Sequence, residues 1–149
     1  MIAMTAETYL KPVPDPTHES KPYWDGLKSG RLLLQKCGQC EKIRHYPRPL
    51  CDACYSFEVK WIEASGLGAV HSWTITHHAF NPGFKLELPY ILVTIDLEEG
   101  VRVQVPLRGA KETDIKLGLP VRIIFEQTDR KSTRLNSSHI QKSRMPSSA

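Results

Sequence analysis

The pattern of apolar and polar residues changes character near residue 64 of this 149-residue chain. After that point, apolar side chains recur at every second position, which is typical of half-buried β-strands. The alternation predicts strands that are joined by short turns and one longer loop, and that form a small, mainly antiparallel barrel of the OB type. The predicted strands are 67–77, 90–97, 101–107 and 121–126.

The first 20 residues lack such a pattern. Prolines occupy positions 12, 14 and 16, and this spacing favours extended backbone and excludes a helix. We therefore expect residues 1–20 to form a flexible arm.

A short helix is predicted directly after this arm, over residues 22–29. Pro22 suits a first helical turn, and Gly30 suits the position just beyond the end. Helical spacing would place Tyr23, Trp24 and Leu27 on one face. This face either packs against the next module or docks on a partner, and the sequence favours neither alternative.

All four cysteines lie within 18 residues, as two C-x-x-C pairs separated by ten residues. Each pair forms a turn that directs both sulfurs to one point, and two such turns supply the four thiolates of a tetrahedral zinc site. Because four protein ligands leave no position for water, the zinc is expected to be structural. Two redox-active dithiols, or an iron site like that of rubredoxin in an electron carrier, are the alternatives. The predicted ligands are Cys37, Cys40, Cys51 and Cys54.

The net charge of +4 comes from the last twenty residues. Residues 130–149 contribute +5, so the rest of the chain carries −1. Six basic and two acidic residues lie between positions 28 and 54. Zinc with four thiolates carries about −2, so we favour neutralisation of the metal site by these basic residues over a nucleic-acid surface. The predicted barrel has six basic and eight acidic residues, which suits phosphate binding poorly.

The segment 131–149, KSTRLNSSHIQKSRMPSSA, has no apolar periodicity and resembles translated sequencing-adapter sequence. We expect residues 130–149 to be a disordered, artefactual tail. The natural chain would then continue differently after about Asp129.

Aromatic residues gather in the long loop between the first two predicted barrel strands, where Phe80 and Phe84 lie. Exposed apolar loops commonly contact another molecule, although these rings could instead fold back and close one end of the barrel. His71, His77 and His78 flank this loop. No Ser, Cys or carboxylate stands in a recognisable relation to them, so structural roles are favoured over catalysis.

The order of motifs resembles a known family. The resemblance covers roughly residues 20–127, and it rests on several motifs together. They are Y-W-x-G-L-x-x-G-R-L from Tyr23, the knuckles C-G-Q-C and C-D-A-C joined by Tyr46-Pro47-Arg48-Pro49, Gly66-x-Gly68, Val70-x-Ser72-Trp73-Thr74, Pro89-Tyr90 and Gly118-Leu119-Pro120-Val121. In this order they resemble the zinc-ribbon/OB-fold proteins encoded beside thiolases and other acyl-CoA enzymes, long described as a domain of unknown function.

This resemblance implies a mainly β protein with an N-terminal helix and rubredoxin-like zinc ribbon (residues 21–63) and a small OB-fold barrel (residues 64–129). It implies a non-catalytic scaffold subunit that binds a thiolase-like, aldolase or hydratase enzyme in a hetero-oligomer and helps hold the coenzyme A thioester. By position, the four cysteines would be the zinc ligands. The surface facing the partner or the acyl-CoA would include Tyr23, Trp24, Trp73, Phe80 and Phe84. Family members continue into a closing segment that the tail replaces here, which predicts an unpaired barrel edge.

A nucleic-acid-binding zinc-ribbon/OB protein is the alternative function. The longest apolar run is far shorter than the ~20 residues of a membrane span. The sequence shows no basic start that is followed by an apolar stretch, so no secretory signal is visible. We therefore expect a cytoplasmic protein without membrane association.

Overall fold

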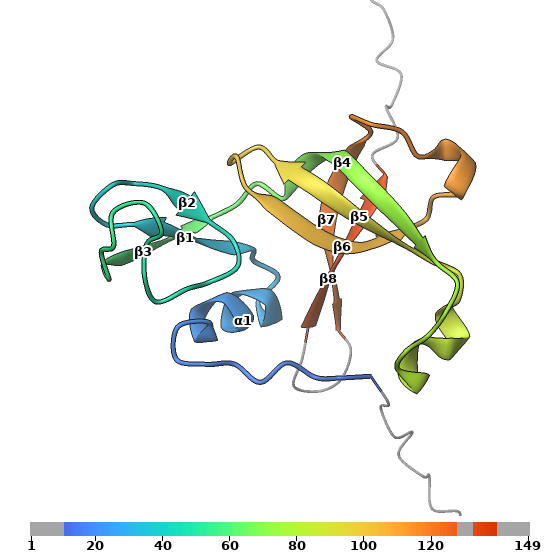
Figure 1. Cartoon of the computed structure of the whole chain (residues 1–149), viewed down its shortest axis with the longest axis horizontal. Coiled ribbons are helices and arrows are strands. Elements are labelled where there is room, and N and C mark those ends of the chain that lie inside the picture. Colours follow the sequence, from blue (N-terminus) through green and yellow to red (C-terminus); the bar gives the residue numbers. More distant parts are fainter. Residues whose placement is uncertain (1–10, 128–132, 140–149) are drawn as a thin grey trace, which may run out of the picture.

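A helix, a three-stranded sheet and a closed barrel follow one another along the chain in the computed structural model, which describes residues 11–127 and 133–139 (Figure 1). The predicted mainly β fold with an N-terminal helix is confirmed. The elements are α1 (Lys21–Lys28), β1 (Leu33–Cys37), β2 (Ile43–Arg44), β3 (Val59–Glu63), β4 (Leu67–Thr76), η1 (Pro82–Glu87, 3-10), β5 (Tyr90–Leu97), β6 (Arg102–Arg108), η2 (Glu112–Asp114, 3-10), β7 (Pro120–Gln127) and β8 (Thr133–His139).

The proline-rich segment before α1 is extended, as its prolines require, and it passes below the helix in the view of Figure 1. Lys11 forms an ion pair with Glu87 and lies 5.4 Å from the centre of the Phe84 ring. This part of the predicted arm therefore contacts the barrel. Residues 1–10 of the arm lie outside the described residues.

The helix α1 begins one residue earlier than predicted and ends before Gly30, whose positive φ of 71° suits glycine. Tyr23 and Leu27 are buried, so this face of the helix packs inside the molecule. In the part of the chain that the structure describes, no helix has the length and apolarity needed to cross a membrane.

The ribbon sheet has the strand order β2-β1-β3, and both pairings are antiparallel. The register pairs Gln35 with Arg44 on one side and with Trp61 on the other. Directly paired residues in a sheet project to the same face. A row of three polar and aromatic side chains therefore crosses one face of the ribbon.

The barrel has the strand order β4-β5-β6-β8-β7, and the four predicted strands appear within two residues of their expected bounds. A register shift between Val70 and Ser72 marks a bulge in β4. At Gly68, a Cβ atom would lie 2.6 Å from the Asp96 carbonyl oxygen, so only glycine allows β4 to approach β5 this closely.

The strand β8 corrects the expectation that residues 130–149 lack structure. It pairs antiparallel with β7 from Val121 to Gln127 and parallel with β6 at Leu107 and Arg108. The unpaired backbone groups of β6 and β7 provide a template for any chain segment within reach. The predicted open edge is therefore closed, while residues 130–132 and 140–149 of the predicted tail lie outside the described residues.

The buried apolar side chains of the helix, the ribbon and the barrel form one continuous cluster. Partly buried Trp24, Trp61 and Ile62 pack against it. Its buried members include Tyr23 and Leu27 from α1, Leu32 and Leu34 from the ribbon, and Val70, Val93, Ile95, Leu97, Val103, Val121 and Ile123 from the barrel.

Candidate metal centre

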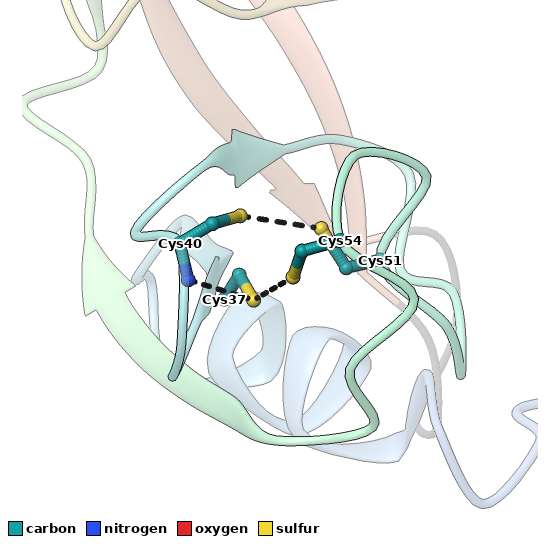
Figure 2. A group of neighbouring side chains, drawn as sticks. All are labelled: Cys37, Cys40, Cys51 and Cys54. Atoms are coloured by element: carbon teal, nitrogen blue, oxygen red, sulfur yellow. Dashed lines mark hydrogen bonds between the residues drawn. The ribbon is translucent and has the colours of Figure 1, made fainter.

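The four predicted metal ligands come together between the two knuckles of the ribbon (Figure 2). All four sulfur atoms lie within 4.8 Å of one another. The Sγ atoms of Cys37 and Cys54 are 3.5 Å apart, as are those of Cys40 and Cys51. Zn–S bonds of about 2.3 Å place the sulfurs of a tetrahedral site about 3.8 Å apart, so this arrangement fits one zinc ion with four cysteine ligands.

The two C-x-x-C segments form the same kind of turn. In both, the N–H of the first cysteine donates to the carbonyl oxygen five residues later, at 2.9 and 3.0 Å. The residues directly after the second cysteines, Glu41 and Tyr55, have left-handed backbone with φ of 62° and 60°. Non-glycine residues seldom adopt this conformation, and its repetition shows that both knuckles impose the same constraint.

Gly38 lets the first knuckle lie against the segment that leads into β3. Its N–H donates to the Glu58 carbonyl oxygen at 2.9 Å. A Cβ atom on Gly38 would lie 2.8 Å from Glu58 Cβ, closer than side chains pack. A residue with a side chain at this position would therefore clash with Glu58.

Backbone amides stabilise the thiolate form of two ligands. The N–H groups of Cys40 and Gln39 point to Cys37 Sγ at 3.5 and 3.4 Å, and they lower the pKa of the Cys37 thiol. In the second knuckle, the corresponding amides of residues 53 and 54 lower the pKa of Cys51 to about 6. Since metals bind the thiolate, this geometry prepares the site for a metal ion.

A charged pair joins the two knuckles. Lys42 Nζ lies 2.6 Å from Asp52 Oδ2. The hydrogen bond to Asp52 raises the pKa of Lys42, and the charges of Asp52, Cys51 and Cys40 add to this effect. Lys42 therefore supplies positive charge beside the thiolates, in line with the neutralising role expected for basic residues here.

The helix residues expected at the docking surface lie in an aromatic cluster. The rings of Tyr23 and Trp24 are 5.1 Å apart, and Tyr23 Oη lies 3.3 Å from His45 Nε2. Trp24 Nε1 donates to Tyr46 Oη at 2.8 Å. Tyr23 is only 4% exposed and does not reach the surface, whereas Trp24 is half-buried.

The barrel residues expected at that surface lie on β4 and on the loop that joins β4 to β5, which contains η1 and is called the η1 loop (residues 77–89). Phe80 is 93% exposed, and its ring lies 4.9 Å from the His78 ring. Phe84 is half-buried beside Tyr90, at 5.9 Å. Trp73 pairs in register with Val93 and remains partly exposed. Phe80 therefore does not close the barrel end, and Phe84 folds back only in part.

One histidine takes part in a charged network that the sequence did not reveal. His71 Nδ1 lies 3.0 Å from Asp96 Oδ2, and Arg102 Nε donates to Asp96 Oδ1 at 2.6 Å. The network is exposed. It places a carboxylate beside His71, a relation that the sequence did not indicate.

Sequence reasoning also missed a buried polar group in the ribbon. Gln35 Oε1 accepts hydrogen bonds from Arg44 Nε and from the backbone N–H of Arg48, both at 2.8 Å. Arg44 Nη2 donates to the Arg48 carbonyl oxygen at 3.2 Å. These three residues are separated along the chain and share no local sequence motif. The sequence alone therefore does not predict that they bond to one another.

Comparison with protein families assigns both parts of the chain. Residues 24–60 match the family "ChsH2, rubredoxin-like zinc ribbon domain", and residues 61–126 match "ChsH2, C-terminal OB-fold domain". The ribbon assignment and the sulfur geometry agree on a structural zinc site.

Individual relatives extend this likeness. The chain is 34% identical to a "Probable enoyl-CoA hydratase alpha subunit" from Thermomonospora curvata over 80% of its own length, but it spans only 37% of that relative. A chain of the solved "Ltp2-ChsH2(DUF35) aldolase" is 31% identical with a TM-score of 0.77, and the match covers 85% of this chain and 98% of that one. A "DUF35 domain-containing scaffold protein" from Pyrococcus furiosus is 33% identical, with 68% of this chain and 74% of that protein covered. The chain therefore belongs to the DUF35 family of zinc-ribbon and OB-fold proteins.

Proposed function

We propose that this chain is a non-catalytic accessory subunit that binds an acyl-CoA enzyme and helps hold the coenzyme A thioester at the partner's active site. The observation that carries the proposal is the likeness to the chain of the solved aldolase, which extends over 98% of that chain at 31% identity. The partner would be a thiolase-like enzyme, an aldolase or a hydratase. The hydratase alpha subunit relative supports a hetero-oligomer.

The chemistry of the chain supports a scaffold role. All four cysteines are positioned for one metal ion, and a zinc ion with four thiolate ligands has no open position at which to activate water. The histidine nearest to a carboxylate, His71, lies in an exposed network with Asp96 and Arg102. The reaction would therefore belong to the partner.

The η1 loop offers the surface for the partner. Phe80 and Leu86 are 93% and 99% exposed, an unusual state for two large apolar side chains in one loop. Lys85 is exposed between them in the chain and would supply a cation for the phosphates of coenzyme A. The ion pair between Lys11 and Glu87 attaches the same loop to the proline-rich segment before α1.

Retention of a partner tests the proposal. The chain is expressed with an acyl-CoA enzyme of the thiolase, aldolase or hydratase class from the same organism, and the amount of enzyme that co-purifies is measured. The double variant Phe80→Glu and Leu86→Glu should reduce the retained enzyme at least about tenfold, because buried apolar anchors contribute most of an interface's affinity.

Leu117 provides the matched control, because it is a large, exposed apolar residue outside the η1 loop. Leu117→Glu should retain the enzyme as the natural sequence does. Failure of the unaltered chain to retain any acyl-CoA enzyme would contradict the proposed function.

A further inference from the structure

A shallow groove of about 260 Å³ lies on the ribbon, and neither a metal ligand nor a residue of the η1 loop lines it. Its floor belongs to the face of the sheet on which Arg44, Gln35 and Trp61 form one row. Its lining residues come from the turn before α1, the first turn of α1, β1, the segment between the knuckles, and β3 with the segment before it. They are His18, Glu19, Pro22, Gln35, Arg48, Pro49, Phe57, Val59 and Trp61.

The buried Gln35 presents an unused donor at this groove. Its side chain is 2% exposed, and its Oε1 atom already accepts two N–H groups, from Arg44 and from the backbone of Arg48. Those two bonds fix the orientation of the amide, so Nε2 is the atom left over. Among the described residues, no acceptor pairs with Nε2, although Gln35 lines the groove.

Positive charge gathers around the same amide. Arg44 is 5% exposed, and its buried Nη1 atom has no hydrogen-bond partner among the described residues. Within residues 11–127, no carboxylate lies within 4.0 Å of the Arg44 or Arg48 guanidinium, although the exposed Arg48 is close enough to Asp52 for its charge to help lower the pKa of that carboxyl. A buried cation without an acidic partner is costly, and it favours a negative group nearby.

One acid and one histidine also face the groove. The Glu19 carboxylate is engaged at the rim, where its own backbone amide and then the Thr17 side chain lower its pKa. His18 is exposed beside it. At the groove, Gln35 nevertheless offers a donor and Arg48 offers a positive charge. Arg44 is bonded to Gln35 but does not line the groove.

The size and the walls of the groove select the kind of ligand. A volume near 260 Å³ is below the about 300–1,000 Å³ of sites that enclose a whole small ligand. It suits one side chain of an extended peptide, with neighbouring residues lying along the rim. Proline, valine and aromatic side chains form the walls, and such walls bind extended peptides in other recognition modules.

We propose that this groove binds an extended segment of the partner enzyme through one acidic side chain. The carboxylate of that side chain accepts hydrogen bonds from Gln35 Nε2 and from the Arg48 guanidinium. Apolar residues on either side of the acid pack on Trp61 and Phe57. This inference rests on the proposed function for the identity of the partner, but the groove can be tested without it.

The direct test is a nuclear magnetic resonance titration of the zinc-loaded, isotope-labelled full chain with acetyl-Pro-Pro-Glu-Pro-Pro-amide. The expected result is saturable shifts of the Gln35 side-chain amide and the Trp61 indole signals. The same peptide with Gln or Lys in place of Glu should bind about three- to fivefold more weakly or worse, as expected for a partly exposed ion pair.

Two charge-reversal variants separate the groove from general electrostatics. Arg48→Glu should abolish the shifts, and its backbone N–H still holds Gln35 in place. Lys60→Glu makes the same change in charge on the strand position next to Trp61, where alternation directs the side chain to the opposite face. It should leave peptide binding unchanged.

Three results would overturn the inference: no shift at Gln35 or Trp61, equal binding of the Glu and Lys peptides, or displacement of the Glu peptide by coenzyme A. Partner retention, measured by co-purification, tests whether the groove contacts the enzyme. Arg48→Glu should lower it several-fold, and unchanged retention would overturn the inference while leaving the proposed function intact. Peptide binding by a chain that retains no acyl-CoA enzyme would instead contradict only the proposed function.

Discussion

The ribbon and the barrel are stabilised in different ways, although their apolar side chains meet in one cluster. The barrel strands bury a regular series of Val, Ile and Leu side chains. The ribbon contributes few apolar residues, and its fully buried side chains include Gln35 and two of the cysteines. The comparison shows how one short chain combines a module held by a metal ion with a module held by the hydrophobic effect.

Removal of the metal should have the largest effect, and it should affect the two regions unequally. Structural zinc contributes about 10–16 kcal/mol in small zinc-binding peptides. A chelator, or Cys51→Ala, should therefore abolish the dispersed amide signals of the ribbon and leave those of β5 and β6. Two-dimensional NMR spectra of the apo and zinc forms measure this. A ribbon that stays folded without metal would contradict the comparison, and bound iron in place of zinc would revive the electron-carrier alternative.

A cavity in the barrel should have the converse effect. Ile95 is fully buried, so Ile95→Ala should lower the free energy of unfolding by about 2–5 kcal/mol. The zinc content should remain one ion per chain. Urea unfolding and metal analysis check both expectations. The exposed Leu117 gives the control, since Leu117→Ala should change stability by less than about 0.5 kcal/mol.

Loss of β8 should weaken the barrel and expose its edges. A chain that ends at Gln127 leaves β6 and β7 without the strand between them. We expect a lower unfolding midpoint and self-association, because unpaired strand edges bind other strands. Size-exclusion chromatography over a range of concentrations measures the second effect. A truncated chain that stays monomeric and equally stable would show that β8 does not complete the barrel.

The smallest predicted effect concerns pH and the junction of the two regions. Burial lowers the pKa of His45, although the Arg102 carbonyl oxygen in β6 partly opposes this. The unfolded chain then takes up the proton first, so stability falls as the pH drops below the ordinary histidine value near 6.5. One histidine accounts for at most about 1.4 kcal/mol per pH unit.

Unfolding midpoints of the natural chain and of His45→Gln should therefore converge as the pH falls below about 6.5. The zinc content is measured in parallel, because acid also releases metal from thiolates. If His45→Gln keeps the pH dependence of the natural chain, the junction histidine does not contribute.

Much of this architecture could be predicted from the sequence because its signals are local. Two residues between cysteines define a knuckle, and alternation defines a strand. The predicted metal ligands and four barrel strands accordingly agree with the structure. The left-handed backbone at Glu41 and Tyr55 follows from the shape of the knuckles. It could not be predicted from residue type, because neither residue favours this conformation.

Features that depend on distant partners could not be predicted in this way. The strand β8 has no apolar periodicity, and it forms where two open edges need a neighbour. The burial of Tyr23 depends on the ribbon that covers its helix. The bonds of Gln35 to Arg44 and Arg48 depend on the register of three strands and on the path of the loop between the knuckles.

The most direct test of the scaffold account is an acyl thioester turnover assay on the purified, zinc-loaded chain, alone and with its partner enzyme. The account predicts no turnover by the chain alone, and turnover by the partner that rises when the chain is added. Thioester turnover by this polypeptide without a second protein would contradict it.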